Sequence, residues 1–172
     1  NVGNDRSVVE RLQLALDAVH TAKRRWHIDP RRIYVAGISG GAKVASILNA
    51  AYPEVIRGAV VIVGISFYEN IPTGTGNQVW GSEFSKPTGT RWALFRSHRL
   101  AVVSGEKDFN YPRIAATIAP MQRDGMTVKF FDTPGMGHHM PTAAAFTEQL
   151  TWVDEPARQQ RDARAAQAAA AF

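Results

Sequence analysis

The chain alternates between helix-patterned segments and short apolar segments, and this alternation restricts its fold more than any other feature. Four apolar segments have the length of strands, at residues 33–36, 58–63, 100–103 and 127–131. Helical patterns surround and separate them, at residues 5–25, 42–51, 91–97, 114–123 and 141–153. Such alternation is typical of a parallel sheet covered by helices on both faces, with right-handed crossovers. We therefore predict an α/β fold, a three-layer sandwich around a mostly parallel sheet.

The chain divides into a core and a tail of different composition. Residues 1–153 are predicted to form one domain, whose first helix would begin with a capping box between Ser7 and Glu10. Residues 154–172 are mostly Ala, Arg and Gln after Pro156, and we expect them to form an extension outside the core, helical or disordered. The chain starts at Asn1 without a methionine, so we interpret it as a fragment or a processed product and leave its compartment open.

Composition excludes several classes of function. The chain has no cysteine, which excludes a disulfide-built scaffold, a cysteine-based zinc site and thiol chemistry. It has 20 Lys and Arg against 15 Asp and Glu, but its densest basic group lies at a predicted helix end and in the loop that follows. We predict that these cations (Lys23, Arg24, Arg25, Arg31 and Arg32) are solvated rather than bound to nucleic acid. No apolar run approaches the ~20 residues of a membrane span.

A serine stands where the first predicted strand meets the next helix. Ser39 is the centre of a Gly-x-Ser-x-Gly pentapeptide, residues 37–41. A serine on a sharp strand-to-helix turn has a strained backbone and tolerates no bulky neighbours, so flanking glycines suit it. The turn would present the hydroxyl at a helix N-terminus, where backbone N–H groups are free. The segment lacks both the Lys-Ser/Thr ending of a phosphate-binding loop and the spacing of a dinucleotide fingerprint.

An acid and a histidine follow the third and fourth predicted strands. Asp108 comes shortly after residues 100–103, and His138 comes in a glycine-containing loop after residues 127–131. Taken singly, such an aspartate is often a turn-former and such a histidine a surface residue. Together with Ser39 they occur in the order serine, acid, histidine, each past a separate strand, as in α/β-hydrolase triads. The carboxyl ends of parallel strands are where the chemistry of such sheets gathers.

Three stretches carry a resemblance to a known family. "IDPRRIYVAGISGG", "VVSGEKDFN" and "TPGMGHHMP" resemble the nucleophile, acid and histidine segments of α/β-hydrolases, and the resemblance extends over residues 5–153. The resemblance covers the C-terminal half of that fold. Within the family, these segments are most similar to bacterial esterases of the polyhydroxyalkanoate-depolymerase and carboxylesterase/phospholipase type. It implies Ser39 as nucleophile, Asp108 as orienting acid and His138 as general base, acting on a small or polymeric ester through an acyl-enzyme, without a cofactor. Peptidases of the prolyl-oligopeptidase type share the serine turn, so amide cleavage is the alternative.

Neighbouring residues compete for two of these roles. His139 is adjacent to His138, which we prefer because it directly follows the Gly-x-Gly. Glu106 and Asp132 compete with Asp108, which we prefer on its position in the motif. No metal is implied, because two adjacent histidines lack the spacing of a zinc pair on one helix face.

One departure from the family pattern affects the predicted chemistry. The amide of Gly40 is expected to donate one oxyanion hydrogen bond, but the family's second donor and its earlier strands lie before the point where this chain begins. The nucleophile strand would then be a sheet edge, open to association with another chain or a missing N-terminal segment. A non-catalytic interaction module is therefore a further alternative.

The long irregular segment at residues 64–90 is the place where a substrate pocket wall is expected. Three aromatic residues, Phe67, Tyr68 and Trp80, lie in it. The other interpretation, which we favour for each aromatic residue singly, is that they pack the loop onto the core.

Overall fold

A four-stranded parallel sheet forms the centre of the molecule. The structure is a computed structural model that describes residues 5–170. Its strand order is β1-β2-β5-β6, with β1 at Val35–Ile38, β2 at Gly58–Ile62, β5 at Arg99–Ser104 and β6 at Thr127–Asp132. All three pairings are parallel, and Ala36 pairs with Val60, Val60 with Ala101, and Ala101 with Lys129. The predicted α/β sandwich around a mostly parallel sheet is confirmed.

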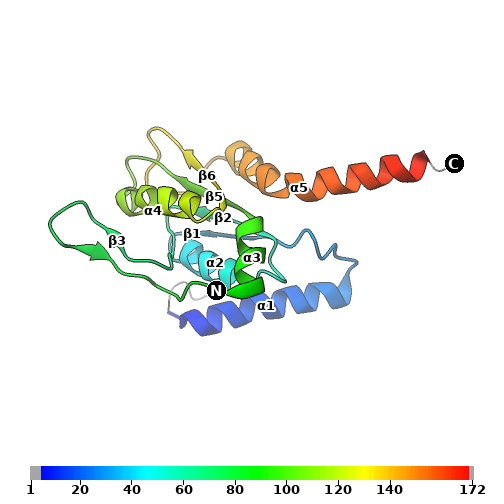
Figure 1. The fold of residues 1–172 in the computed structure, drawn as a ribbon, viewed down its shortest axis with the longest axis horizontal. Helices are drawn as coiled ribbons and strands as arrows, with labels where there is room; N and C mark the ends of the chain where they lie inside the picture. Colours follow the sequence, from blue (N-terminus) through cyan, green and yellow to red (C-terminus); the bar gives the residue numbers. More distant parts are fainter. Residues whose placement is uncertain (1–4, 171–172) are drawn as a thin grey trace.

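Helices cover both faces of this sheet (Figure 1). They are α1 (Val8–Arg25), α2 (Gly40–Ala51), α3 (Gly89–Ser97), α4 (Tyr111–Arg123) and α5 (Ala143–Ala169). One face packs with α2, α3 and α4 around Val61 and Val102, and the other packs with α5 around Ile62 and Val103. The two central strands are apolar at both sets of alternating positions because both of their faces are buried.

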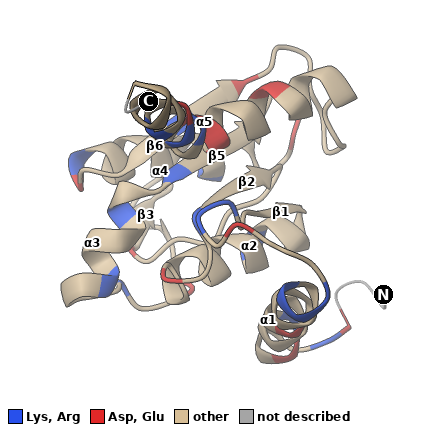
Figure 2. Ribbon diagram, turned by 90° about the vertical axis from the view of Figure 1, so that its right-hand side faces the viewer, with Lys and Arg blue, Asp and Glu red and all other residues tan. Residues whose placement is uncertain are grey.

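The first helix lies at the outside of the helical layer. It begins with the predicted capping box, in which the Ser7 side chain accepts from the Glu10 amide and the Glu10 carboxylate accepts from the Ser7 amide. None of its residues is fully buried, and its apolar stripe packs against Ile33, Leu48 and Ile56. Its last turn carries Lys23, Arg24 and Arg25, where cations complement the helix dipole. Lys and Arg also occur on other helices, with Asp and Glu among them (Figure 2).

The last helix does not end at Val153, where the sequence pattern placed its end. It continues to Ala169, so the predicted boundary between residues 153 and 154 falls inside one helix (Figure 1). Asp154 is buried and accepts hydrogen bonds from Arg32 and Tyr34 at 2.7–2.8 Å. Residues 158–170 are exposed.

The helix passes Pro156 because a side chain takes over the lost hydrogen bond. Proline has no N–H, so the carbonyl of Trp152, four residues earlier, loses its helical donor. The guanidinium of Arg99, at the start of β5, donates to this carbonyl at 2.8 Å and also pairs with Glu155. A contact between distant segments thus keeps the helix continuous where local sequence rules predict a break.

The irregular segment after β2 packs mainly against the core. It contains a short antiparallel hairpin, β3 (Ile71–Pro72) with β4 (Val79–Trp80). Phe67 and Tyr68 are buried, and the Tyr68 hydroxyl donates to Asp124 at 2.9 Å. Trp80 packs against the same core cluster. The interpretation favoured for each of these residues singly, that Phe67, Tyr68 and Trp80 pack the loop onto the core, is therefore confirmed. The alternative, that these three side chains form a pocket wall, is wrong because the core takes up their apolar surface.

Among the helices within residues 5–170, none combines the length and the apolar character needed to cross a membrane.

Candidate functional site

Ser39 lies on a sharp turn between β1 and α2. Its backbone has φ 52° and ψ −119°, a conformation that side-chain-bearing residues rarely adopt. Glycines make room for the turn on both sides. A Cβ at Gly37 would lie 2.7 Å from the amide nitrogen of Ala42, and one at Gly64 would lie 3.0 Å from the carbonyl carbon of Ser39. Gly37 and Gly64 are therefore required by close backbone contacts, whereas a Cβ at Gly41 would meet nothing within 4 Å.

The turn is anchored to the neighbouring strand and opens into a helix. The Ser39 amide donates to the Ile62 carbonyl at 2.8 Å, which extends the β1–β2 pairing by one residue. Gly40 is the first residue of α2, so its N–H has no acceptor within the helix. The positive end of the helix dipole lies at the same place. A partial negative charge beside Ser39 would be stabilised there.

The structure brings together the three side chains that the sequence singled out. The Nε2 of His138 lies 2.9 Å from the Oγ of Ser39, and the Nδ1 of His138 lies 2.8 Å from Oδ1 of Asp108. Ser39 follows β1, Asp108 follows β5 and His138 follows β6. The carboxyl ends of these parallel strands share one edge of the sheet. The three side chains form one continuous hydrogen-bonded chain from a hydroxyl to a carboxylate.

The Asp108 carboxylate is fully buried and hydrogen-bonded at both oxygens. Its side chain has no exposed surface, whereas the His138 side chain is 27% exposed. Oδ2 accepts from the Ser104 hydroxyl at 2.8 Å, and Oδ1 accepts from the Asn110 amide at 3.2 Å. Without such donors a buried carboxylate would be strongly disfavoured. Ser104 was not predicted; its position as the last residue of β5, four residues before Asp108, is the signal that could have found it.

The competing residues make other contacts. His139 uses Nδ1 with the Met140 carbonyl at 2.8 Å, and its Nε2 accepts from the Gly137 amide at 3.3 Å. Both Glu106 oxygens accept from the Gly135 amide at 2.9 Å, and this hydrogen bond lowers the pKa of that carboxyl. Glu106 therefore fastens the histidine loop to the acid loop.

The third carboxylate, Asp132, accepts from the Tyr111 hydroxyl at 2.8 Å.

An aromatic ring covers the outer side of the histidine. Phe109 stacks on His138 with ring centroids 4.3 Å apart and an interplanar angle of 28°. Phe109 is 74% exposed, which is unusual for a phenylalanine. Sequence analysis did not select it, although it directly follows the acid. The Phe109 ring thus lies against one face of the imidazole that contacts Ser39.

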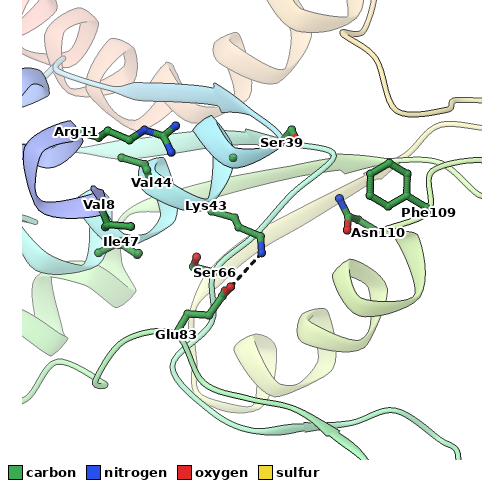
Figure 3. A pocket seen from close by; sticks show the side chains of 11 residues that line it. Val8, Arg11, Ser39, Lys43, Val44, Ile47, Ser66, Glu83, Phe109 and Asn110 are labelled. Carbon is green, nitrogen blue, oxygen red and sulfur yellow. Dashed lines mark hydrogen bonds and ion pairs between the residues drawn. The ribbon is translucent and has the colours of Figure 1, made fainter. Parts of the chain in front are cut away.

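A cavity of about 660 Å³ opens beside Ser39 (Figure 3). This size suits a small organic molecule. The helices α1 and α2 contribute apolar side chains to its wall, Val8, Val44 and Ile47, and also the cations Arg11 and Lys43. Lys43 pairs with Glu83 at 3.1 Å (Figure 3). The irregular segment does contribute to this wall, through Ser66 and Glu83 rather than through its aromatic residues. The lining residues are Val8, Arg11, Ser39, Gly40, Lys43, Val44, Ile47, Ser66, Glu83, Phe109 and Asn110.

Residues 5–170 contain no cluster of three or more His, Cys, Asp or Glu side chains suited to hold a metal ion.

Two curated proteins match part of the sequence. The chain is 44% identical over 46 residues to poly(3-hydroxyalkanoate) depolymerase C of Paucimonas lemoignei. It is 36% identical over 47 residues to an acetylxylan esterase of Coprinopsis cinerea. Each match covers 27% of this chain, and 11% and 13% of the respective relative. No protein-family model matches the sequence.

Solved structures match much more of the chain. The carboxylesterase of Mesorhizobium loti superposes with a TM-score of 0.59 at 17% sequence identity. The match covers 83% of this chain and 59% of that enzyme. The chain thus corresponds to somewhat more than half of the esterase it resembles in structure.

Proposed function

Because the chain has the α/β-hydrolase fold, we propose that it carries the active site of a serine hydrolase that cleaves carboxylic esters. The observation that carries this proposal is the unbroken chain from Ser39 Oγ through His138 to the buried Asp108, with contacts of 2.9 and 2.8 Å. Nucleophile, base and orienting group within hydrogen-bond reach of one another are the signature of covalent catalysis by serine.

In the first step the Ser39 hydroxyl attacks the ester carbonyl carbon. As the new C–O bond forms, the hydroxyl proton moves to Nε2 of His138, which lies 2.9 Å from Oγ. Asp108 accepts the Nδ1–H of the imidazole, holds the tautomer that leaves Nε2 free, and stabilises the imidazolium without taking its proton. The Ser104 and Asn110 hydrogen bonds keep the carboxylate in this orientation.

The carbonyl oxygen becomes an oxyanion in this step. The Gly40 amide, at the first position of α2, is the donor that we assign to it, assisted by the dipole of the twelve-residue helix. Collapse of the tetrahedral intermediate breaks the ester C–O bond, and the alcohol leaves with the proton from His138 Nε2. Water then attacks the acyl-enzyme with the same base, which releases the acid and restores Ser39.

The choice of ester over amide is supported by the partial sequence matches, one to a protein named as an esterase and one to a protein named as a depolymerase of poly(3-hydroxyalkanoate), a polyester. The cavity beside Ser39, whose wall is partly apolar, is the place for the acyl or alcohol group of a small ester or of one unit of a polymeric ester. The polymeric substrate in the name of the first relative belongs to that protein, and for this chain it is one candidate among esters.

The test is labelling with a fluorophosphonate probe, which reacts with activated serines. We expect the wild-type chain to be labelled and Ser39→Ala to be unlabelled, with Ser82→Ala, which changes an exposed serine, as the matched control. Paired nitrophenyl ester and nitroanilide substrates then measure ester against amide cleavage. Faster anilide cleavage would favour the peptidase alternative. A folded wild-type chain that takes no label would contradict the proposal and favour a non-catalytic module.

A further inference from the structure

The phenylalanine that follows the candidate acid is held in an exposed position. Phe109 is 74% exposed, although both of its neighbours in the chain are fixed. On one side, the buried Asp108 accepts from the Ser104 hydroxyl at 2.8 Å. On the other side, Nδ2 of Asn110 donates to the Val63 carbonyl at 3.0 Å. The loop itself therefore sets the place of the ring.

The exposed ring belongs to the wall of the cavity into which Ser39 opens. Single apolar residues on a protein surface are common, so the place of this ring matters more than its exposure. It lines the cavity together with the apolar side chains of Val8, Val44 and Ile47. Figure 3 shows Phe109 on one side of Ser39 and these three side chains on the other. A ligand in the cavity thus meets apolar surface on two separate walls.

The ring also lies against the proposed base. Its centroid is 4.3 Å from that of the His138 imidazole, whose Nε2 is 2.9 Å from the Oγ of Ser39. In ester cleavage the same Nε2 gives its proton to the oxygen of the leaving alcohol, so that oxygen has to come within about 3 Å of it. The first carbon atoms of the alcohol then lie within reach of Phe109.

We propose that Phe109 binds the alcohol portion of the ester and gives the site a preference for apolar alcohols, alkyl or aromatic. An exposed phenyl ring gains by covering apolar surface, and gains further by stacking on another ring. This assignment rests on the proposed ester cleavage and gives one part of the substrate to one side chain. The acyl portion stays bonded to Ser39 after the alcohol has left, so Phe109 has no alcohol to contact in the second half of the reaction.

The test compares esters that differ only in their alcohol with esters that differ only in their acid. A pH-stat gives kcat/KM for ethyl, hexyl and benzyl butyrate, and for ethyl acetate and ethyl hexanoate. In Phe109→Ala we expect kcat/KM to fall about tenfold for the hexyl and benzyl esters and less than about threefold for ethyl butyrate. The ratios among the three ethyl esters should stay as in the wild type. Phe109→Leu, which keeps an apolar side chain, should recover most of the preference for hexyl butyrate.

The matched control removes another exposed aromatic side chain. Trp26, at the C-terminal end of α1, is 63% exposed and is not among the residues that line the cavity. Trp26→Ala should therefore leave all five values of kcat/KM unchanged. Equal losses for all three butyrates in Phe109→Ala would overturn the proposal, because a ring that acted only through His138 would affect every ester alike.

A second readout separates binding of the alcohol from an effect on the base. The butyryl-enzyme formed from nitrophenyl butyrate, followed by intact-mass spectrometry, should lose its acyl group at the same rate in the wild type and in Phe109→Ala. Slower loss in the variant would overturn the proposal, since His138 serves both halves of the reaction.

Failure of this assignment can be told apart from failure of the proposed function. A wild-type chain that cleaves none of these esters and takes no fluorophosphonate label would reject ester cleavage itself. A wild-type chain that cleaves them, with the same alcohol preference as Phe109→Ala, would reject only the role of Phe109.

Discussion

The two ends of the sheet each hold a histidine, and their surroundings make them opposites. At the carboxyl end, His138 has a partner at both ring nitrogens, the Ser39 hydroxyl and the Asp108 carboxylate. At the amino end, Nδ1 of His98 is buried without a partner, beside the positive charge of Arg57. The same side chain is thus hydrogen-bonded at both nitrogens at one end and held neutral at the other. What a histidine does is decided by the groups around its ring.

The two ends of the sheet also differ in backbone strain. Ser39 and Val63 are the non-glycine residues with positive φ among those described, and both follow strands at the carboxyl end. Such conformations cost about 1–3 kcal/mol each and persist where the surroundings hold them. The amino end has instead the ion pairs that join α5 to the sheet, Arg32 with Asp154 and Arg99 with Glu155. Backbone strain is thus concentrated at the candidate active site, whereas the ion pairs that hold α5 are concentrated at the other end of the sheet.

The largest expected effect separates the two histidines directly. Replacing His138 with alanine should lower kcat/KM for a nitrophenyl ester by roughly 10⁴-fold or more, because Ser39 loses its base. His98→Ala should change it less than about threefold, because the ring lies at the other end of the sheet. His139→Ala is the control for a change within the same loop. Comparable losses in His138→Ala and His98→Ala would remove the functional contrast between the two ends.

The next effect tests the carboxylate behind His138. Asp108→Asn should lower kcat by about 10⁴-fold, because the amide favours the tautomer that leaves Nε2 protonated. Glu106→Gln keeps an acceptor for the Gly135 amide and should retain most of the activity. Steady-state kinetics on one ester measure both variants. A larger loss in Glu106→Gln than in Asp108→Asn would reassign the acid.

A stability measurement tests the ion pairs that join α5 to the residues at the amino ends of the strands. Asp154→Ala should lower the free energy of unfolding by about 2–3 kcal/mol, because it leaves Arg32 and the Tyr34 hydroxyl without their shared acceptor. Urea unfolding gives the value. Asp162→Ala, which breaks an exposed ion pair further along α5, should leave the midpoint unchanged. Equal effects would mean that α5 is not anchored through Asp154.

The smallest effect is the pH dependence caused by His98. Its pKa is about 4 in the folded chain against an ordinary 6.5, so the unfolded chain binds a proton that the folded chain does not. The contribution of neutral His98 to the free energy of unfolding is complete above pH 6.5 and is lost as the pH falls toward 4. The loss amounts to up to about 2 kcal/mol for this partly exposed ring.

His98→Gln, which cannot titrate, should flatten this part of the stability profile. A wild-type profile that stays level between pH 6.5 and 4 would show that His98 is not held neutral by the fold.

The sequence alone determined the alternation of helices and parallel strands and the positions of Ser39, Asp108 and His138 past three strand ends. These follow from local rules: apolar periodicity, the glycines around Ser39, and the shared edge at which parallel strands end. Helix boundaries were less predictable. The end of α5 was misplaced because Pro156 normally stops a helix, and local rules do not include the donor that Arg99 supplies.

Only the tertiary structure decided between residues of the same type that are neighbours in sequence. His138 and His139 differ by one position, yet one contacts Ser39 and the other turns to the Met140 carbonyl. It also showed that Phe67 and Tyr68 belong to the core and that three arginines line the same cavity as His98. Such contacts join residues far apart in the sequence, 99 residues for Ser39 and His138 and 122 for Arg32 and Asp154. The physical reason is that hydrogen bonding and burial depend on distance in space, which packing of the whole chain sets and local pattern does not.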